Sequence, residues 1–279
     1  MECTAPKVGN VTPEQSFDDL TYEHFVQSAP ITAKWLSRAS TDGVGFVIEQ
    51  AAREIMETVG QNTHLGILLL LAPLAAAGDR DDLPRVLESL TVADAKHAYY
   101  AIRIMEPGGL GEAEDQDVRD EPTETLLECM KLAAGRDTIA KQYANSFSDA
   151  FLFADQLDAA AFAHDWPSAV LHLQINVLSR IPDTLIARKC GNETAKEATN
   201  RAEDILHHSQ PAHQVTLPLA GGSELRPGEG NRPILRFDNW LRADGHRRNP
   251  GTTADMIAAI LFVTLREGRM KPPEKFLNG

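Results

Sequence analysis

The sequence is poor in cysteine, in aromatic residues and in long hydrophobic runs, and each shortage excludes a class of protein. Its three cysteines, Cys3, Cys129 and Cys190, form no CxxC pair, which excludes a disulfide framework and a cysteine zinc site. The longest apolar run, 65–77, contains Pro73 and is too short to span a bilayer, so it predicts a buried helix. With 6% aromatic residues and many alanines, the composition favours an all-α fold.

Positive charge is also scarce, and this limits the ligands that the chain can bind. The 279 residues include 27 Lys and Arg against 40 Asp and Glu, a net charge of −13. We therefore expect no nucleic-acid partner and no membrane partner. A site for a polyanionic small molecule would have to create local positive potential or recruit metal ions. A homo-oligomer stays possible on these numbers.

The first ten residues contain no apolar segment of the kind that a secretory signal requires. Together with the scattered cysteines, this predicts a cytoplasmic protein.

Several familiar catalytic motifs are absent. There is no nucleophile elbow, Walker loop, Rossmann fingerprint or HExxH sequence. The glycine-rich stretch 108–111 lacks the Lys-Ser/Thr continuation of a phosphate loop and follows a predicted helix rather than a strand. The nine histidines include no pair at helical metal-ligand spacing, so function has to be sought in other residue types.

Helical patterning dominates what is present. Apolar residues recur at helical spacing over 43–60, and no alternating stretch is longer than about four residues. We predict one all-α domain over 1–279, with about ten helices packed around a buried central helix and with the Ile67 and Ile257 helices in its core. The Pro- and Gly-rich segment 209–233 is predicted to be an exposed, mobile loop.

An acidic segment over 112–121 allows two interpretations. It contains Glu112, Glu114, Asp115, Asp117, Asp120 and Glu121. The segment is either a solvated loop or a source of one or two ligands for Mg²⁺, which prefers oxygen.

The stretch 249–256 opens an apolar helix and has the composition of a phosphate site. Asn249 suits an N-cap and Pro250 the first helical position, while Gly251 lets a ligand approach the backbone. Thr252, Thr253 and Asp255 would then line the first turn. A helix start presents free N–H groups and a positive dipole end, so this one is either an ordinary capped helix or an anion site.

Three other segments also combine glycine with polar residues at predicted helix ends, namely 7–10, 62–66 and 183–191. Four such segments in one helical domain fit a nucleotide site built from helix termini. Purely structural roles are also open: Asp183 as a helix cap, Lys189 as a surface charge and Asp255 as a partner of the helix dipole. The four segments supply donors at Lys7, Asn62, Thr63, Lys189, Thr252 and Thr253, and carboxylates at Asp183 and Asp255.

The order of these segments resembles that of a known family. In sequence they are Glu2 with Pro6-Lys7-x-Gly9-Asn10, Asn62-Thr63-x-x-Gly66, Asp183 followed by Lys189-x-Gly191, and Asn249-Pro250-Gly251-Thr252-Thr253-Ala254-Asp255. This order resembles the triphosphoribosyl-dephospho-CoA synthase family, and the resemblance extends from Glu2 to about Gly268. The stretches 71–74, 107–111 and 136–140 are similar to a branch met in archaea and in bacteria with pterin-linked one-carbon chemistry. Val8 departs from the family pattern, which has proline there, and His64 stands where asparagine is frequent in the branch.

The resemblance implies a reaction. It implies a pentosyltransferase that joins ATP to 3′-dephospho-CoA, releases adenine and forms 2′-(5″-triphosphoribosyl)-3′-dephospho-CoA, with Mg²⁺ as the expected cofactor. Two alternatives stay open: a related ribosyl or nucleotide transferase whose acceptor is a pterin-type cofactor precursor, and a non-catalytic nucleotide-binding helical protein.

The resemblance also implies roles for the residues of the four segments. Carboxylate chemistry would fall to Asp255 and Asp183, as Mg²⁺ ligands or as the base, with Glu2 as a further candidate. Asn62 and Thr63 would orient ribose or phosphate, and Asn10 and Gly66 would belong to the same binding site. Phosphates would be held by Lys7, Lys189 and the helix start at Asn249, Gly251, Thr252 and Thr253.

Overall fold

A computed structural model describes residues 1–113, 115–208 and 232–276. The described residues form fifteen α-helices and no strand, which confirms the all-α prediction. The helices outnumber the predicted ten because short ones, such as α2 (Ala39–Asp42) and α5 (Leu83–Glu88), occupy connections between longer ones. Of the predicted mobile loop, residues 209–231 lie outside the described residues, while Arg232 and Pro233 begin α14 (Arg232–Arg242).

The chain divides into two compact units. The middle unit comprises Glu23–Leu152, and the terminal unit comprises Met1–Tyr22 together with Phe153–Gly279. The chain passes from one unit to the other within α1 (Tyr22–Leu36) and again within α9 (Ser148–Gln156). The prediction of one domain over 1–279 stays a prediction.

The middle unit is built on α4 (Leu65–Ala76), which is buried on all sides, as its uniformly apolar sequence predicts. Pro73 has no N–H, so the carbonyl of Leu69, four residues earlier, lacks its helical partner. The hydroxyl of Tyr143 donates to that carbonyl over 2.6 Å. The proline is thus tolerated in the core because a side chain of α8 replaces the missing donor. Besides α1, α2 and α5, the unit contains α3 (Val44–Thr58), α6 (Val92–Met105), α7 (Leu126–Ala133) and α8 (Thr138–Ala144).

Helices α3 and α6 pack closely because of a glycine. A Cβ on Gly45 would lie 2.4 Å from the Cα of Asp94, so only glycine fits. The carboxylate of Asp94 accepts hydrogen bonds from the Gly45 N–H at 2.9 Å and, in the capping box of α6, from the N–H of Thr91 at 2.9 Å. One residue therefore caps α6 and fixes the start of α3 against it.

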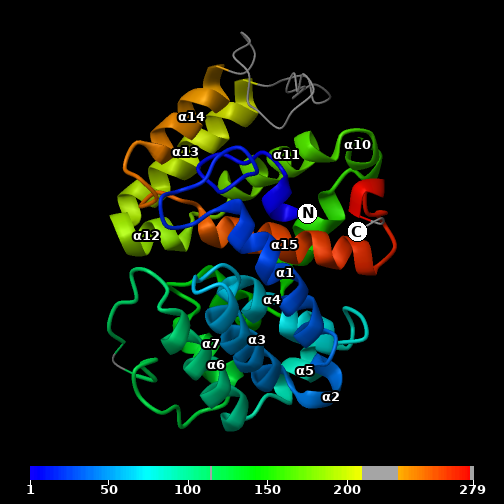
Figure 1. Cartoon of the computed structure of the whole chain (residues 1–279), viewed down its shortest axis with the longest axis vertical. Helices are drawn as coiled ribbons and strands as arrows, with labels where there is room; N and C mark the ends of the chain where they lie inside the picture. Colours follow the sequence, from blue (N-terminus) through cyan, green and yellow to red (C-terminus); the bar gives the residue numbers. More distant parts are fainter. Residues whose placement is uncertain (114, 209–231, 277–279) are drawn as a thin grey trace. The chain divides into compact units, whose positions relative to one another are not determined.

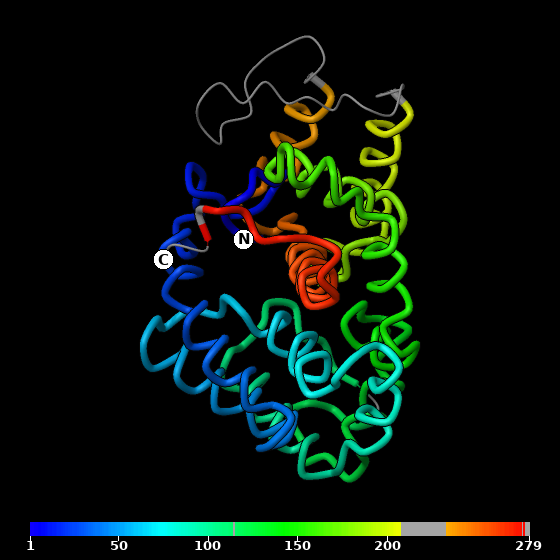
Figure 2. Tube along the Cα trace, turned by 90° about the vertical axis from the view of Figure 1, so that its right-hand side faces the viewer, coloured from blue at the N-terminus to red at the C-terminus, as the bar shows by residue number. Residues whose placement is uncertain are grey.

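The terminal unit is arranged around α15 (Gly251–Arg266), which Figure 2 views nearly along its axis. Helices α11 (Trp166–Leu178) and α12 (Thr184–Cys190) and the N-terminal turn Glu2–Thr4 pack against α15. Helix α13 (Asn192–His208) packs against α11, α12 and α14, and α10 (Ala159–His164) against α11 (Figure 1). A short turn, Glu274–Phe276, ends the described chain. The apolar core of α11 to α14 includes Val8, Leu171, Ile175, Leu178, Ile186, Ala198, Ile205, Ile234, Phe237 and Leu241.

Candidate functional site

Backbone hydrogen bonds to side chains of the terminal unit hold the segment that follows Lys7 in place. The N–H of Val8 donates to the Gln174 side-chain oxygen over 2.8 Å, and the Gln174 amide donates back to the Val8 carbonyl over 2.9 Å. The N–H of Gly9 donates to Asp238 over 2.7 Å. Gly9 has φ +66°, and a Cβ there would lie 2.7 Å from the Cβ of Leu241, so glycine is required both by conformation and by space.

All three N–H donors of the Lys7 ammonium are engaged by groups of the N-terminal segment. It forms an ion pair with the Glu2 carboxylate at 3.0 Å and donates to the carbonyls of Glu2 at 3.1 Å and Val11 at 3.0 Å. An ammonium group has three N–H donors, and its side chain here is 1% exposed. In this arrangement Lys7 has no donor left for a phosphate, and Glu2 is held as its counterion. We assign both residues a role in folding the N-terminal segment.

Asn10 links the N-terminal segment to the start of α15. Its amide donates to the Pro250 carbonyl over 3.1 Å, and its own carbonyl accepts from the Arg242 guanidinium over 2.6 Å. Arg242 also donates to Asp238 over 2.9 Å. Asn10 therefore positions the residues before α15, and this engages one of the two N–H donors of its amide.

One carboxylate caps two helices at the centre of this unit. The Oδ1 atom of Asp183 accepts from the backbone N–H groups of Leu185 at 2.9 Å and Ile186 at 3.0 Å, which caps α12. Its Oδ2 atom accepts from the N–H of Thr253 at 2.7 Å and the hydroxyl of Thr253 at 2.8 Å, which caps α15 from another part of the chain. Asp183 thereby joins the starts of the two helices.

These four hydrogen bonds change the role that we assign to Asp183. An ionised carboxylate has about four acceptor positions, and the protein itself fills them here. Asp183 is 1% exposed, and burial raises the pKa of its carboxyl while the bonds from Ile186 and Thr253 oppose that rise. The arrangement leaves no position for Mg²⁺ or for a substrate proton. We assign Asp183 a positioning role instead of the predicted metal-binding or basic role.

The start of α15 differs from the sequence prediction by one residue. The helix begins at Gly251 and its N-cap is Pro250, so the prediction of Asn249 as the N-cap is wrong. The reason is that Asp183 supplies the capping oxygen from a distant segment. The glycine serves helix packing, because a Cβ on Gly251 would lie 2.6 Å from the Leu185 side chain.

Thr252, Thr253 and Asn249 are all buried at this helix start. The Thr253 hydroxyl donates to Asp183, and the Thr252 hydroxyl accepts from the hydroxyl of Thr184 at 3.3 Å. The side-chain oxygen of Asn249 has no partner among the described residues. Asp255 is half-buried in the first turns of the same helix. Of the predicted phosphate donors in this stretch, the hydroxyl of Thr253 is therefore already committed to Asp183.

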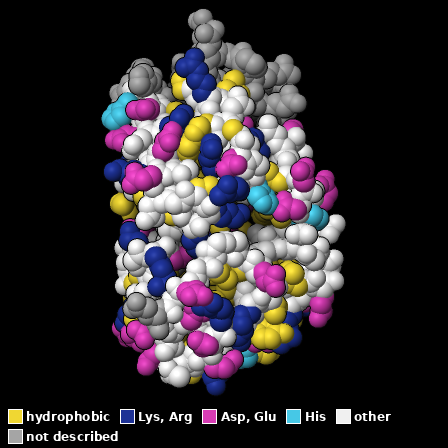
Figure 3. Space-filling view, turned by 90° about the vertical axis from the view of Figure 1, so that its left-hand side faces the viewer, with side chains coloured by type: hydrophobic (Ala, Val, Ile, Leu, Met, Phe, Trp, Pro, Cys, Tyr) yellow, Lys and Arg dark blue, Asp and Glu magenta, His cyan; other side chains and the backbone are white. Residues whose placement is uncertain are grey.

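Positive charge gathers next to this helix start, in an otherwise acidic chain. The ammonium of Lys189, at the end of α12, makes no hydrogen bond or ion pair with any described residue, and burial lowers its pKa. Arg247 donates to the Lys189 carbonyl over 3.1 Å, and Arg248 donates to the Trp240 carbonyl over 2.8 Å. Figure 3 shows several Lys and Arg side chains, with Asp and Glu side chains among them, on the side of the molecule where Figure 1 places α12.

Arg247 and Arg248 are not among the site residues predicted from the sequence. A pair of arginines directly before a predicted anion site, in a chain of net charge −13, was the available signal.

The predicted site residues 62–66 lie in the middle unit, at the start of α4. The Thr63 hydroxyl donates to the Ser28 hydroxyl over 2.7 Å, so it is engaged in the fold. His64 Nδ1 lies 2.7 Å from the Thr32 hydroxyl, and burial lowers the pKa of His64 to about 4. Asn62 is half-buried, and Gly66 is the second residue of α4. The other predicted site residues belong to the terminal unit.

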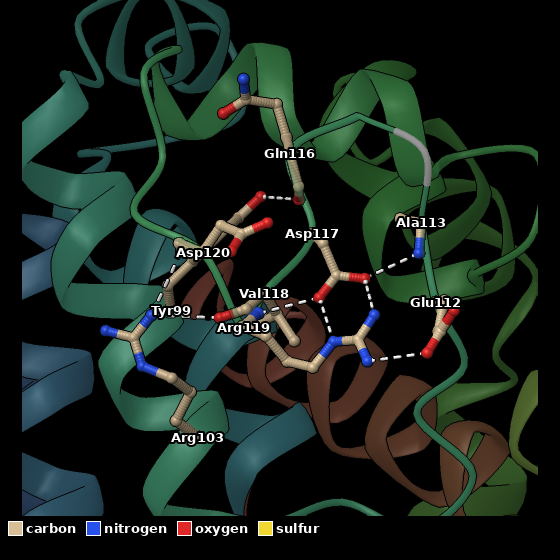
Figure 4. Close-up of polar contacts among 9 residues, drawn as sticks. All are labelled: Tyr99, Arg103, Glu112, Ala113, Gln116, Asp117, Val118, Arg119 and Asp120. Carbon is tan, nitrogen blue, oxygen red and sulfur yellow. Dashed lines mark hydrogen bonds and ion pairs between the residues drawn. The ribbon is translucent and has the colours of Figure 1, made fainter.

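Glu114 lies outside the described residues, and the other residues of the acidic segment form a loop closed by arginine (Figure 4). Asp117 accepts from the Arg119 guanidinium at 2.8 and 3.0 Å and from the N–H groups of Arg119 at 2.9 Å and Ala113 at 2.7 Å. Glu112 forms a further ion pair with Arg119 at 3.0 Å. These bonds hold the pKa of Asp117 well below its usual range, with the Arg119 side chain as the largest cause. The contacts favour a structured, solvated loop over a Mg²⁺ site.

Comparison with known proteins identifies the family. The sequence model of the CitG family, described as ATP:dephospho-CoA triphosphoribosyl transferase, matches residues 1–273. The chain belongs to the CitG family. None of the curated proteins matches the sequence. The match spans all four polar segments, so it confirms the resemblance that their order indicates.

A solved structure has the same fold as this CitG family member. It comes from Archaeoglobus fulgidus and is provisionally assigned as a triphosphoribosyl-dephospho-CoA synthase. The two chains are 25% identical and superpose with a TM-score of 0.65, over 88% of this chain and 99% of that chain. The family is one of pentosyltransferases.

Mg²⁺ is the cofactor expected for the CitG family, and only some of the predicted ligands in this chain fit it. No group of three or more His, Cys, Asp or Glu residues in the described parts of the chain could hold a metal ion. The oxygens of Asp183 are filled by the protein, so Asp183 does not fit a metal ligand. Mg²⁺ commonly binds through one or two carboxylates together with substrate phosphates, and Asp255 is a carboxylate of this type. In the described residues no helix is both long and apolar enough to cross a membrane.

Proposed function

We propose that this protein transfers the triphosphoribosyl group of ATP to 3′-dephospho-CoA, releasing adenine and forming 2′-(5″-triphosphoribosyl)-3′-dephospho-CoA. The observation that carries this proposal is the CitG family match over residues 1–273, which includes every segment with candidate site residues. The A. fulgidus structure supports it, since its fold extends over 88% of this chain.

The reaction exchanges one glycosidic bond for another. The 2′-hydroxyl oxygen of the acceptor bonds to the anomeric carbon of the ATP ribose, and the bond from that carbon to the adenine nitrogen breaks. The bonding electrons leave with adenine, and adenine ends with the proton that the hydroxyl loses. The transition state has oxocarbenium character, as in glycoside hydrolysis, so a base near the attacking hydroxyl and a donor near the leaving nitrogen accelerate it.

The triphosphate is the part of the substrate that the terminal unit is best built to hold. Lys189 offers an ammonium with no protein partner among the described residues, and Arg247 is tied to its carbonyl. Both lie next to the start of α15, whose dipole favours negative charge. Lys189 is half-buried and so binds phosphate more strongly than an exposed cation would, because less water competes for it, whereas Arg247 is exposed and also pairs with Asp244 at 3.6 Å. We therefore assign phosphate binding to Lys189 and Arg247 rather than to Lys7.

Among the predicted carboxylates, Asp255 is the one that we propose for chemistry. Glu2 is paired with Lys7, and Asp183 caps two helices. Asp255 lies half-buried near the start of α15. We propose that it serves as the base for the acceptor hydroxyl or as a ligand of the Mg²⁺ that accompanies the triphosphate, an ion that would neutralise phosphate charge when bound. The roles of Asn62 and Gly66 in ribose or phosphate binding, a cytoplasmic location and a homo-oligomer stay predictions.

An adenine-release assay over a panel of acceptors tests this function. The purified protein is incubated with ATP and Mg²⁺ plus dephospho-CoA, CoA or a reduced pterin, and free adenine is measured by chromatography. We expect adenine with dephospho-CoA and a loss of at least about 100-fold in rate for Asp255→Asn, the usual size for removing a general base. Adenine with the pterin alone would favour the alternative acceptor. No adenine with any acceptor would reject transfer altogether.

A further inference from the structure

Asn249 has a buried side chain that the rest of the protein leaves unsatisfied. It is 8% exposed, and its Oδ1 atom makes no hydrogen bond with any described residue. Its backbone, in contrast, is engaged on both sides: its N–H donates to the His246 carbonyl over 3.2 Å, and its carbonyl accepts from the Gly251 N–H over 2.9 Å. The main chain thus fixes the side chain at this place, directly before α15.

A buried acceptor without a hydrogen-bond partner destabilises the folded protein. Leaving such a group without a partner costs about 1–3 kcal/mol, and nearly all buried polar groups in folded proteins are bonded. Neighbouring donors are used elsewhere, since the Asn10 amide donates to Pro250 and the Thr253 N–H and hydroxyl donate to Asp183. A group on a bound ligand is therefore a partner that fits the Oδ1 atom of Asn249.

The chemistry of the orphaned atom selects the kind of ligand group. Oδ1 is an acceptor, so its partner must be an N–H or O–H donor. The oxygens of an ionised phosphate are themselves acceptors and cannot fill this role. The donors of a nucleotide lie on its nucleoside part, as ribose hydroxyls or as the exocyclic amine of adenine. This reverses the sequence prediction, which placed Asn249 among the residues that hold phosphate.

We propose that Asn249 accepts a hydrogen bond from a donor on the nucleoside part of the nucleotide substrate and thereby selects the nucleoside. Lys189 and Arg247 hold the phosphates of the same substrate. This rests on the proposed function only in so far as the substrate is a nucleotide. Asn249 is a specificity residue in this account, because it recognises a group that inorganic phosphates lack.

Calorimetric titrations of matched ligands and variants test the proposal. The ligands, each with Mg²⁺, are ATP, tripolyphosphate, 2′-deoxy-ATP, 3′-deoxy-ATP and purine riboside triphosphate, which lacks the 6-amino group. The variants are Asn249→Leu, which removes the amide at similar size, and Asn249→Asp, which keeps an acceptor. Asn239→Leu makes the same change at an exposed position of α14 and serves as the control.

The expected result has two parts. For the wild-type protein, one of the three analogues binds about 10- to 100-fold more weakly than ATP, and that analogue identifies the donor. In Asn249→Leu, ATP binds as weakly as that analogue, the two are no longer distinguished, and tripolyphosphate binds as in wild type. Asn249→Asp keeps the discrimination, and Asn239→Leu behaves as wild type. Asn249→Asp also provides the test if Asn249→Leu does not fold.

Three results would overturn the proposal. Tripolyphosphate binding that weakens as much as ATP binding in Asn249→Leu would place the amide on a phosphate. Equal binding of ATP and all three analogues by the wild-type protein would show that no nucleoside donor is recognised. An absence of ATP binding by the wild-type protein would show the same. Failure of the transferase function is seen separately, as ATP binding without adenine release, and it leaves the ligand comparison intact.

Discussion

At the scale of single residues, the terminal unit is organised by buried polar groups that serve as connectors. Asp183 joins the starts of α12 and α15, Gln174 pairs with the backbone of Val8, and Asn10 holds Pro250. The Val8 N–H donates to Gln174, a bond that proline, expected at this position from the resemblance, would lack. Several residues that the sequence suggests as ligand donors thus form hydrogen bonds within the protein instead.

The role of Asp183 can be tested by separating stability from activity. We predict that Asp183→Asn lowers the free energy of unfolding by about 1–3 kcal/mol, because its amide nitrogen would face the N–H of Thr253 or of Leu185 as a second donor. Urea unfolding measures the loss. Asp183→Ser, which retains a short acceptor, should be active below its own unfolding transition. An Asp183→Asn protein of wild-type stability but without activity would instead support a catalytic carboxylate.

His64 makes a prediction about pH. Burial lowers its pKa in the folded protein to about 4, below the ordinary value of 6.5 in an unfolded chain. Between these values the unfolded state binds more protons, so stability is full above pH 6.5 and falls as pH decreases toward 4. The shift corresponds to about 3 kcal/mol. Urea unfolding across this range should show a shallower decrease for His64→Asn, and equal slopes for the two proteins would contradict a buried neutral histidine.

At the scale of helices, Pro73 and Tyr143 form a coupled pair. Tyr143→Phe leaves the Leu69 carbonyl without its donor, and we predict a loss of about 1–3 kcal/mol in the free energy of unfolding. Pro73→Ala restores a backbone N–H at the position that normally bonds this carbonyl. In that background Tyr143→Phe should therefore cost less. A double-mutant cycle by urea unfolding measures the coupling, and strictly additive effects would show that the hydroxyl does not replace the proline's missing N–H.

The sequence predicted helix boundaries well where the spacing of apolar residues within the helix determines them. Apolar spacing placed α3 and α4 within about two residues of their observed ends, since both bury a continuous apolar face or surface. The start of α15 was misplaced because its cap comes from Asp183, far away in the sequence. The partners of Lys7 and the closure of the acidic loop by Arg119 were equally invisible to local patterns. Contacts between distant segments decide which polar residues stay available for a ligand.

At the scale of the whole molecule, a chain of net charge −13 must bind a highly charged anion. In the terminal unit the Lys189 ammonium makes no hydrogen bond or ion pair with any described residue, and its pKa is lowered by burial, with the charge of Asp19 partly opposing that fall. We predict that Lys189→Gln weakens ATP binding by about 10- to 100-fold, the usual range for a charge-assisted hydrogen bond. Wild-type binding should weaken with added salt more steeply than binding by the variant. Lys196→Gln, at an exposed position of α13, is the control in the same calorimetric titration.

A loss of ATP affinity in Lys196→Gln equal to that in Lys189→Gln would show that only overall charge matters. Unchanged affinity in Lys189→Gln would move the triphosphate away from the end of α12.

The most direct test of triphosphoribosyl transfer is the mass balance of one reaction. The protein, ATP, Mg²⁺ and 3′-dephospho-CoA are incubated together, and all products are followed by mass spectrometry. We predict equal amounts of free adenine and of a product with the summed mass of ATP and dephospho-CoA less adenine, with all three phosphates of ATP retained. Release of ADP or pyrophosphate in place of adenine, or adenine without the joined product, would contradict the transfer that the family match supports.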